Sequence, residues 1–113
     1  MRTKNHMKTI RLKVNKASNF YEKCVGLIGK NEKTCLYLET RFGIHTFGMR
    51  YKIDILILDK KNIVRKIKKS LPPNRFFFWK PIYCKVLEIP SGLIDKNNIL
   101  PGDKIYLKLK SNS

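Results

Sequence analysis

The sequence predicts a small, mainly β domain built as an antiparallel β-sandwich or barrel. Six or seven short segments alternate apolar and polar residues as strands do, and turn residues separate them. Strands and helices do not follow one another as in βαβ units, which argues against a parallel α/β fold. The 113 residues fit one domain with one modest core. We expect a single domain over residues 1–113, ordered over about 7–110, with a short basic N-terminal tail and a polar C-terminal tail.

The first third of the chain predicts a strand, a short helix and a second strand. In "MKTIRLKV", Ile10, Leu12 and Val14 alternate with Lys or Arg, as in a half-exposed strand. In "SNFYEKCVGLIG", apolar residues recur at helical spacing, with Ser18 placed to cap the start and Gly29 placed to end the helix. The segment "TCLYLE" is the next strand candidate.

The rest of the chain predicts a hairpin, a packed loop and two further strands. "KIDILIL" is followed by the polar turn "DKKN" and by "IVRKIK", so residues 53–68 are predicted to form a hairpin. "SLPPNRFFFWKPI" holds three prolines and four consecutive aromatic residues, which predicts a loop that packs against the body. "YCKVLEI" and "KIYLKLK" are predicted strands, and "PSGLIDKNNI" offers one helical turn between them.

Asp54 interrupts the most apolar strand. Ile53, Ile55 and Ile57 point to one face of this strand, whereas Asp54 shares the other face with leucines. Both faces are apolar, which predicts a central strand. A carboxylate in that position needs a cation, backbone donors or an opening. Arg50 is one candidate partner, and a structural role in fixing a loop is the alternative.

The motif "HTFGM" supplies the other candidate site residues. His45, Phe47 and Met49 have the same parity, so His45 and Met49 are expected to line one surface. The functional interpretation is a small pocket with an imidazole and an apolar floor, and the alternative is a core or edge histidine with satisfied hydrogen bonds. The candidate ligand-binding residues are His45, Thr46, Met49, Arg50 and Asp54.

The charge balance indicates an affinity for polyanions. The chain has 25 Lys and Arg against 8 Asp and Glu, a net charge of +17, and no acid lies between Asp59 and Glu88. Aromatic residues next to cations can stack on bases, although lysine on a strand edge also prevents aggregation, and three consecutive phenylalanines favour a core. The candidate anion-binding residues are Lys60, Lys61, Arg65, Lys66, Lys68, Lys69 and Arg75.

The sequence contains no segment that we identify as a membrane or export signal. The basic start lacks the apolar run of a secretory signal, and no stretch is apolar enough to span a bilayer, so we expect a cytoplasmic protein. Cys24, Cys35 and Cys84 are isolated and odd in number, which favours reduced thiols. No nucleotide loop, paired carboxylates or metal-ligand spacing is present, so we predict no cofactor and no metal.

Four motifs in order resemble a widespread prokaryotic family of unknown function. "CVGLIGK", "HTFGMRYKIDILILD", "VLEIPSG" and "LPGDKI" are similar to the domain of unknown function 192, and this chain resembles its HTFGM-type branch. The resemblance implies a compact, mostly β domain with a jelly-roll-like or barrel-like sheet and a short helix near the N-terminus. It implies no catalytic roles. The family's marks fall on Gly26, Leu27, Gly29, Phe47, Met49, Asp54, Leu87, Glu88, Gly92, Gly102 and Asp103.

Four of these marked positions have structural interpretations of their own. Gly92 and Gly102 are expected in turns that need positive φ, with Asp103 accepting hydrogen bonds from nearby backbone N–H groups. Glu88 is expected to pair with an arginine or lysine.

Three functions remain open from the sequence. The first is a binding or accessory module with a small polar site near HTFGM, whose small ligand or protein partner is unknown. The second is a basic surface that binds nucleic acid or another polyanion. The third is an enzyme using His45 with Asp54 or a cysteine, which we consider less consistent with the sequence than a non-enzyme.

Overall fold

The computed structural model describes residues 7–16, 35–41 and 43–109. Within these residues the chain forms eight strands and one short helix. The elements are β1 (Thr9–Lys16), β2 (Leu36–Glu39), β3 (Gly43–His45), β4 (Ile53–Leu58), β5 (Val64–Leu71), β6 (Phe76–Phe78), β7 (Lys85–Pro90), α2 (Leu93–Lys96) and β8 (Lys104–Leu109). The helix predicted over residues 18–29 lies outside the described part of the chain.

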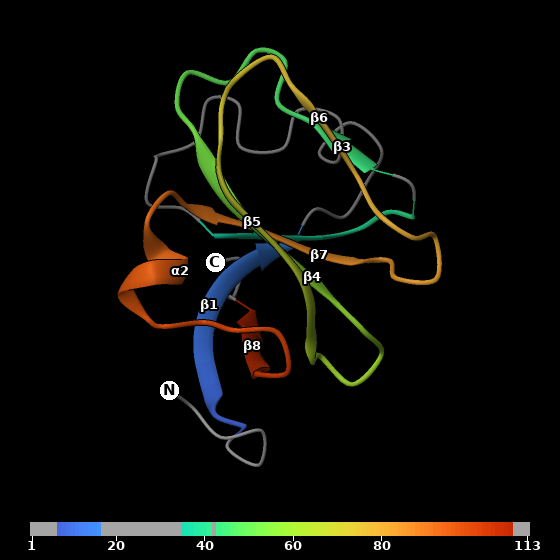
Figure 1. Ribbon diagram of the computed structural model, residues 1–113, viewed down its shortest axis with the longest axis vertical. Helices are drawn as coiled ribbons and strands as arrows, with labels where there is room; N and C mark the ends of the chain where they lie inside the picture. The colour runs from blue at the N-terminus through green and yellow to red at the C-terminus, as the bar shows by residue number, and fades with distance from the viewer. Residues whose placement is uncertain (1–6, 17–34, 42, 110–113) are drawn as a thin grey trace.

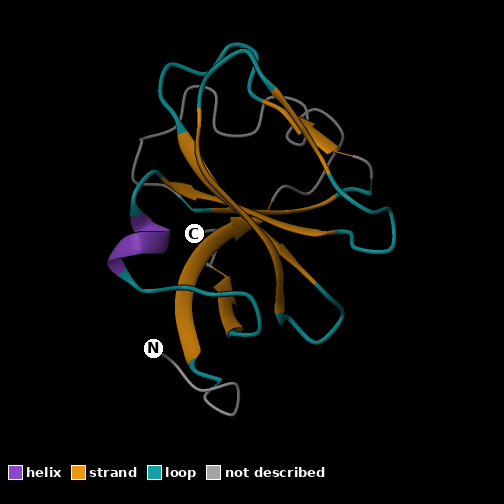
Figure 2. Cartoon of the chain, viewed as in Figure 1, coloured by secondary structure: helices purple, strands orange, loops and turns teal. Residues whose placement is uncertain are grey.

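Six of the strands form one curled sheet, and the other two form a small separate sheet (Figures 1 and 2). The order in the large sheet is β5-β4-β7-β2-β1-β8, and β3 pairs with β6. The predicted small, mainly β fold is therefore confirmed. The expectation of purely antiparallel pairing is wrong for β1, which runs parallel to both β2 and β8. Apolar alternation reports which residues form strands, but it carries no information on strand direction.

The curl of the sheet brings β8 back towards the start of β5. The Val64 N–H donates to the Asp103 carbonyl over 2.8 Å, and the Gly102 N–H donates to the Val64 carbonyl over 2.8 Å. An isolated bridge joins Ile63 to Lys104. The large sheet is thus a half-barrel whose opposite edge strands meet at one end.

Two hydrophobic clusters cover the two faces of the large sheet. Inside the curl, leucines from β4 and β7 pack with Ile94 of α2 and with Ile105 of β8. On the outer face, isoleucines from β4 pack with Ile44 of β3, with Met49 and with Trp79, so the small sheet covers this face. The small sheet and α2 consequently lie on opposite sides of the large sheet.

The predicted hairpin is confirmed as β4 and β5, joined by a turn over residues 59–63. All six residues of β4 are buried because the strand lies between β5 and β7 with a cluster on each face. Within the described residues, the strands predicted from "MKTIRLKV", "TCLYLE", "YCKVLEI" and "KIYLKLK" are present as β1, β2, β7 and β8, and the predicted helical turn is present as α2.

The proline-rich aromatic segment differs from its prediction in part. Phe76–Phe78 form the strand β6, which pairs antiparallel with β3. This pairing is possible because the prolines lie outside the three paired residues.

Candidate functional site

The HTFGM motif forms a turn at the end of β3. The Met49 N–H donates to the Thr46 carbonyl over 3.2 Å, and Gly48, the third residue of this turn, has a φ of 85°. Type II turns favour glycine at that position because a side chain there would be strained. The turn holds Phe47 at its corner, with 41% of its surface exposed, and directs Met49 into the core.

Thr46 joins this turn to the loop that precedes β6. Its side chain is fully buried; its hydroxyl donates to the Pro72 carbonyl over 2.7 Å and accepts from the Arg75 N–H over 2.9 Å. The Thr46 N–H also donates to the Arg75 carbonyl over 2.9 Å, and its carbonyl accepts from Asn74 over 3.1 Å. Thr46 therefore sets where Arg75, and the strand that follows it, lie relative to Phe47.

Four rings gather on the solvent side of the small sheet, and we call them the aromatic face. Its members are His45, Phe47, Phe76 and Phe78. The Phe76 and Phe78 rings are stacked, with centroids 5.7 Å apart and planes 14° apart. Phe47 meets Phe76 edge to face at 4.9 Å. Phe76 and Phe78 are 58% and 62% exposed, so this is apolar surface left in water.

Strand alternation explains why these rings share one side. In the ladder of the small sheet, His45 lies opposite Phe76, and Gly43 lies opposite Phe78. The intervening Phe77 turns inward and packs against the outer core cluster. The side chains at alternate positions of a strand share a face, so a three-residue aromatic strand exposes its two outer rings.

Gly43 provides the space for the Phe78 ring. A Cβ at Gly43 would lie 2.7 Å from Cδ1 of Phe78 and 2.7 Å from the Phe77 carbonyl oxygen. Both distances are shorter than van der Waals contact, so Phe78 lies across the bare backbone of β3. A larger residue at Gly43 would displace the ring.

The His45 ring has a defined orientation in this cluster. The Phe47 N–H donates to Nδ1 of His45 over 3.3 Å, so Nδ1 is the acceptor and the neutral ring carries its proton on Nε2. The imidazole lies 5.4 Å from the Phe47 ring centroid and 6.4 Å from that of Phe76. His45 thus belongs to the aromatic face as a fourth ring with a polar edge.

Cations flank the aromatic face. Arg75 directly precedes Phe76, and its side chain is exposed. Lys66 of β5 places its Nζ 5.2 Å from the Phe77 ring centroid and 3.5 Å from the Phe78 carbonyl oxygen. Lys66 thus reaches the edge of β6 from the side of the inward-turned Phe77 ring, and Arg75 neighbours Phe76 along the chain.

The structure does not bring the five predicted ligand-binding residues to one opening. His45 and Arg50 are exposed, whereas Thr46, Met49 and Asp54 are buried. Met49 does not line a surface with His45, as the parity of a continuous strand had predicted, because the turn at 46–49 ends the alternation. Whether any of the five binds a ligand remains a prediction.

Asp54 lies on the other side of the large sheet from His45. Its Oδ1 accepts from the Ser70 N–H over 2.8 Å, and its Oδ2 accepts from the Gly92 and Ile94 N–H groups over 3.0 and 3.1 Å. The ion pairs between described residues do not include one from Arg50 to Asp54, so the proposed partner was wrong. Asp54 fixes the start of α2 and the end of β5, which is the structural alternative considered above.

The sequence predicted a cation beside Glu88, and no ion pair between described residues includes this carboxylate. It lies on β7 between Leu36 of β2 and Ile55 of β4, and its side chain is 3% exposed. Among the residues that the structure describes, its Oε1 has no hydrogen-bond partner. Burial raises the pKa of Glu88 from 4.5 to about 7.

The turn residues near the C-terminus agree with their predictions. Gly92 and Gly102 have φ values of 93° and 97°. The buried Asp103 accepts from the Leu100 N–H over 2.9 Å and from the Lys8 N–H over 3.3 Å.

The predicted anion-binding residues spread along the turn after β4, along β5 and into the loop before β6. Arg65 is paired with Asp59 at 2.8 Å, and Lys69 is paired with Asp95 at 2.6 Å. Lys66 lies at the edge of β6, Arg75 directly precedes Phe76, and Lys60 lies in the turn after β4. These residues consequently do not form one cluster.

Sequence reasoning assigned the three consecutive phenylalanines to the core and therefore missed most of the aromatic face. Phe76 and Phe78 are exposed, which overturns that assignment. The available signal was the two-residue spacing within "RFFFWK", since a paired strand places the first and third rings on the same side.

Two structural findings bear on metal binding and membranes. Across the described ranges, no three side chains of His, Cys, Asp or Glu come together as a metal-ligand set. The same part of the chain contains no helix with the length and apolar character needed to cross a bilayer.

Comparison with known proteins identifies the family. The model of the domain of unknown function 192, described as an uncharacterized ACR, matches residues 1–107. The chain belongs to this family. A UPF0127 protein of Pyrococcus furiosus is 31% identical over 104 residues, which cover 87% of this chain and 89% of that protein. A UPF0127 protein of Thermococcus sibiricus is 33% identical over 111 residues, or 92% of this chain and 70% of the relative.

A solved structure supports the fold. A protein of unknown function from Novosphingobium aromaticivorans aligns with a TM-score of 0.66 at 18% identity, covering 87% of this chain and 73% of the other. At that identity the likeness shows a shared fold and no activity.

Proposed function

We propose that this chain is a binding module whose aromatic face binds single-stranded nucleic acid. The observation that supports the proposal is the solvent exposure of stacked phenylalanine rings beside Arg75 and Lys66. Exposed apolar surface of this kind is rare on a monomer and marks contact surfaces.

The chemistry of the face favours unpaired bases over other apolar partners. Bases stack on aromatic rings without regard to sequence, and each stack contributes about 1–3 kcal/mol. The sugar-phosphate backbone needs cations near the rings. Arg75 directly precedes Phe76, and Lys66 Nζ lies 3.5 Å from the Phe78 carbonyl oxygen at the edge of β6. The net charge of +17 favours approach of any nucleic acid.

Duplex DNA or RNA fits the face less well than a single strand. In a duplex the bases are stacked on one another, so flat rings on a protein surface cannot reach their faces. A module of this kind therefore binds single strands more tightly than duplexes at equal charge. A cytoplasmic location, which the sequence predicts, would place the chain where single-stranded RNA is available.

The test compares two exposed aromatic residues on different parts of the molecule. Binding of a fluorescein-labelled single-stranded oligonucleotide of about 12 nucleotides is followed by anisotropy, with the matching duplex as competitor. Phe76→Leu removes a ring from the face, and Tyr106→Leu removes a ring of similar exposure from β8. Phe76→Leu is expected to weaken binding about tenfold, whereas Tyr106→Leu changes it less than about twofold.

The salt dependence separates stacking from charge. Arg75→Gln is expected to reduce the slope of log K against log salt by about 0.7, the value for one phosphate contact on a single strand. Phe76→Leu should leave this slope unchanged, because the ring carries no charge. Equal losses in the Phe76 and Tyr106 variants, or equal affinity for duplex and single strand, would reduce the binding to non-specific attraction and refute the proposal.

A further inference from the structure

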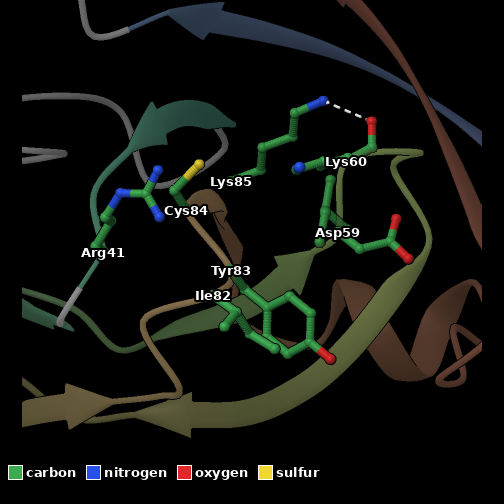
Figure 3. Close-up of a pocket in the computed structure, with 8 residues that line it drawn as sticks. Arg41, Asp59, Lys60, Ile82, Tyr83, Cys84 and Lys85 are labelled. Atoms are coloured by element: carbon green, nitrogen blue, oxygen red, sulfur yellow. Dashed lines mark hydrogen bonds between the residues drawn. The ribbon is translucent and has the colours of Figure 1, made fainter.

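A cleft lies at the end of β4, and the functional proposal does not use it. The turn after β4 and the segment before β7 enclose a cleft of about 330 Å³ (Figure 3). Its cationic lining comes from Arg41, Lys60 and Lys85. Its apolar wall comes from Leu58, Ile82 and Tyr83.

Two of the cations are held in place by neutral acceptors. Lys85 Nζ donates to the Lys60 carbonyl over 3.1 Å and to Oδ1 of Asn62 over 3.0 Å, and Figure 3 shows the first of these bonds. Nη1 of Arg41 donates to the Pro81 carbonyl over 3.1 Å. Neutral acceptors orient a cation without cancelling its charge, so both positive charges remain available to an anion.

The acid that lines the cleft is already engaged. Asp59 accepts from the backbone N–H groups of Lys61 and Ile63 over 2.8 and 3.0 Å and pairs with Arg65 at 2.8 Å. Although burial acts to raise the pKa of Asp59, these bonds outweigh it and hold the pKa below 3.8. Its negative charge is therefore compensated by Arg65 and by the backbone N–H groups of the turn, and the lining of the cleft remains net positive.

The apolar wall adds a second requirement on the ligand. Ile82 is 68% exposed, and the Tyr83 ring lies next to it in the cleft. The Tyr83 backbone is fixed because its carbonyl accepts from Nε1 of Trp79 over 2.7 Å. A volume near the lower end of the range for small-molecule sites leaves room for one anionic group and one small ring.

We infer that this cleft binds a phosphomonoester of a small apolar or aryl group. The phosphate lies between Arg41 and Lys85, and the organic group lies against Ile82 and Tyr83. This site is separate from the aromatic face, so it does not depend on nucleic-acid binding. Inorganic phosphate satisfies only the cationic half of the site.

The probe is phenyl phosphate, followed by shifts of the backbone amide signals in two-dimensional NMR spectra of the full chain. Saturable shifts are expected at residues 59–60 and 82–85, with affinity at least about fivefold higher than for inorganic phosphate. Arg41→Gln should weaken phenyl phosphate binding about tenfold. Arg11→Gln makes the same substitution at an exposed position of β1 and should change the affinity less than about twofold.

A second readout uses Cys84, which also lines the cleft. Saturating phenyl phosphate should slow alkylation of Cys84 by iodoacetamide, measured by mass spectrometry of its peptide. Four results would overturn the inference: shifts that do not saturate, equal losses in the Arg41 and Arg11 variants, equal affinity for inorganic phosphate, and unprotected Cys84.

Discussion

Substitution of Glu88 by glutamine is expected to remove a large part of the pH dependence of stability. The carboxyl is buried on β7, its Oε1 has no hydrogen-bond partner among the described residues, and its pKa is raised by burial to about 7. An unfolded chain exposes the group to water, where its pKa is 4.5. The folded state therefore binds more protons than the unfolded state between these two pH values.

The sign and size of the effect follow from this difference. Because the folded pKa is the higher one, the contribution of Glu88 to stability is fully present below about pH 4.5 and is lost as the pH rises through about 7. Each pH unit of that interval is worth about 1.4 kcal/mol, so the whole interval is worth about 3 kcal/mol. Glu88→Gln cannot ionise, so it should gain about 3 kcal/mol relative to the unmodified chain between about pH 4.5 and pH 8.

Urea unfolding measures this gain directly. Trp79 is the single tryptophan and is 7% exposed, so its fluorescence reports unfolding of the outer cluster. The free energy of unfolding is compared for the two proteins across the pH range, and titrations common to both cancel in the difference. Glu39→Gln, the same change at an exposed position of β2, is the control for replacing a carboxylate by an amide. If the free energy of unfolding depends on pH in the same way for Glu88→Gln and for the unmodified chain, the pKa of Glu88 is not raised by folding and the reasoning is refuted.

Two further predictions concern residues that hold the fold. Asp54→Asn should lower the free energy of unfolding by about 2–4 kcal/mol, because three backbone N–H groups lose a charged acceptor and one of them faces the amide NH₂. Urea titration measures this loss, and a loss below about 0.5 kcal/mol would contradict the prediction. Thr46→Val keeps the shape but removes the hydroxyl that bonds Pro72 and Arg75, so it should cost about 1–3 kcal/mol in the same assay. The exposed Thr9→Val on β1 should cost less than about 0.5 kcal/mol, and an equal loss in the two threonine variants would mean that the buried hydroxyl contributes nothing specific.

Local patterns were enough to predict most strands and the burial of β4. The alternation in Ile53–Leu58 is a property of consecutive residues, because side chains of a strand point to opposite faces in turn. The same period predicts the exposed positions of β1 and β8. The need of Asp54 for backbone donors also followed from its apolar setting, although Arg50 was wrongly offered as its partner.

Strand direction and the composition of the site depended on contacts between distant parts of the chain. β1 runs parallel to β8, and nothing in the alternation of either strand distinguishes parallel from antiparallel pairing. His45 and Asp54 are nine positions apart in the sequence, yet the turn at 46–49 and the two faces of the sheet separate them.

By itself, the sequence determined the family, the mainly β class and the buried central hairpin strand, because these rest on motifs and on the two-residue period of a strand. Only the tertiary structure decided that Phe76 and Phe78 face water and that Glu88 is buried with no ion pair to any described residue. Exposure depends on what covers a side chain, and the covering residues come from β2, β3 and β4, which lie far from these positions in the sequence. No local pattern contains that information.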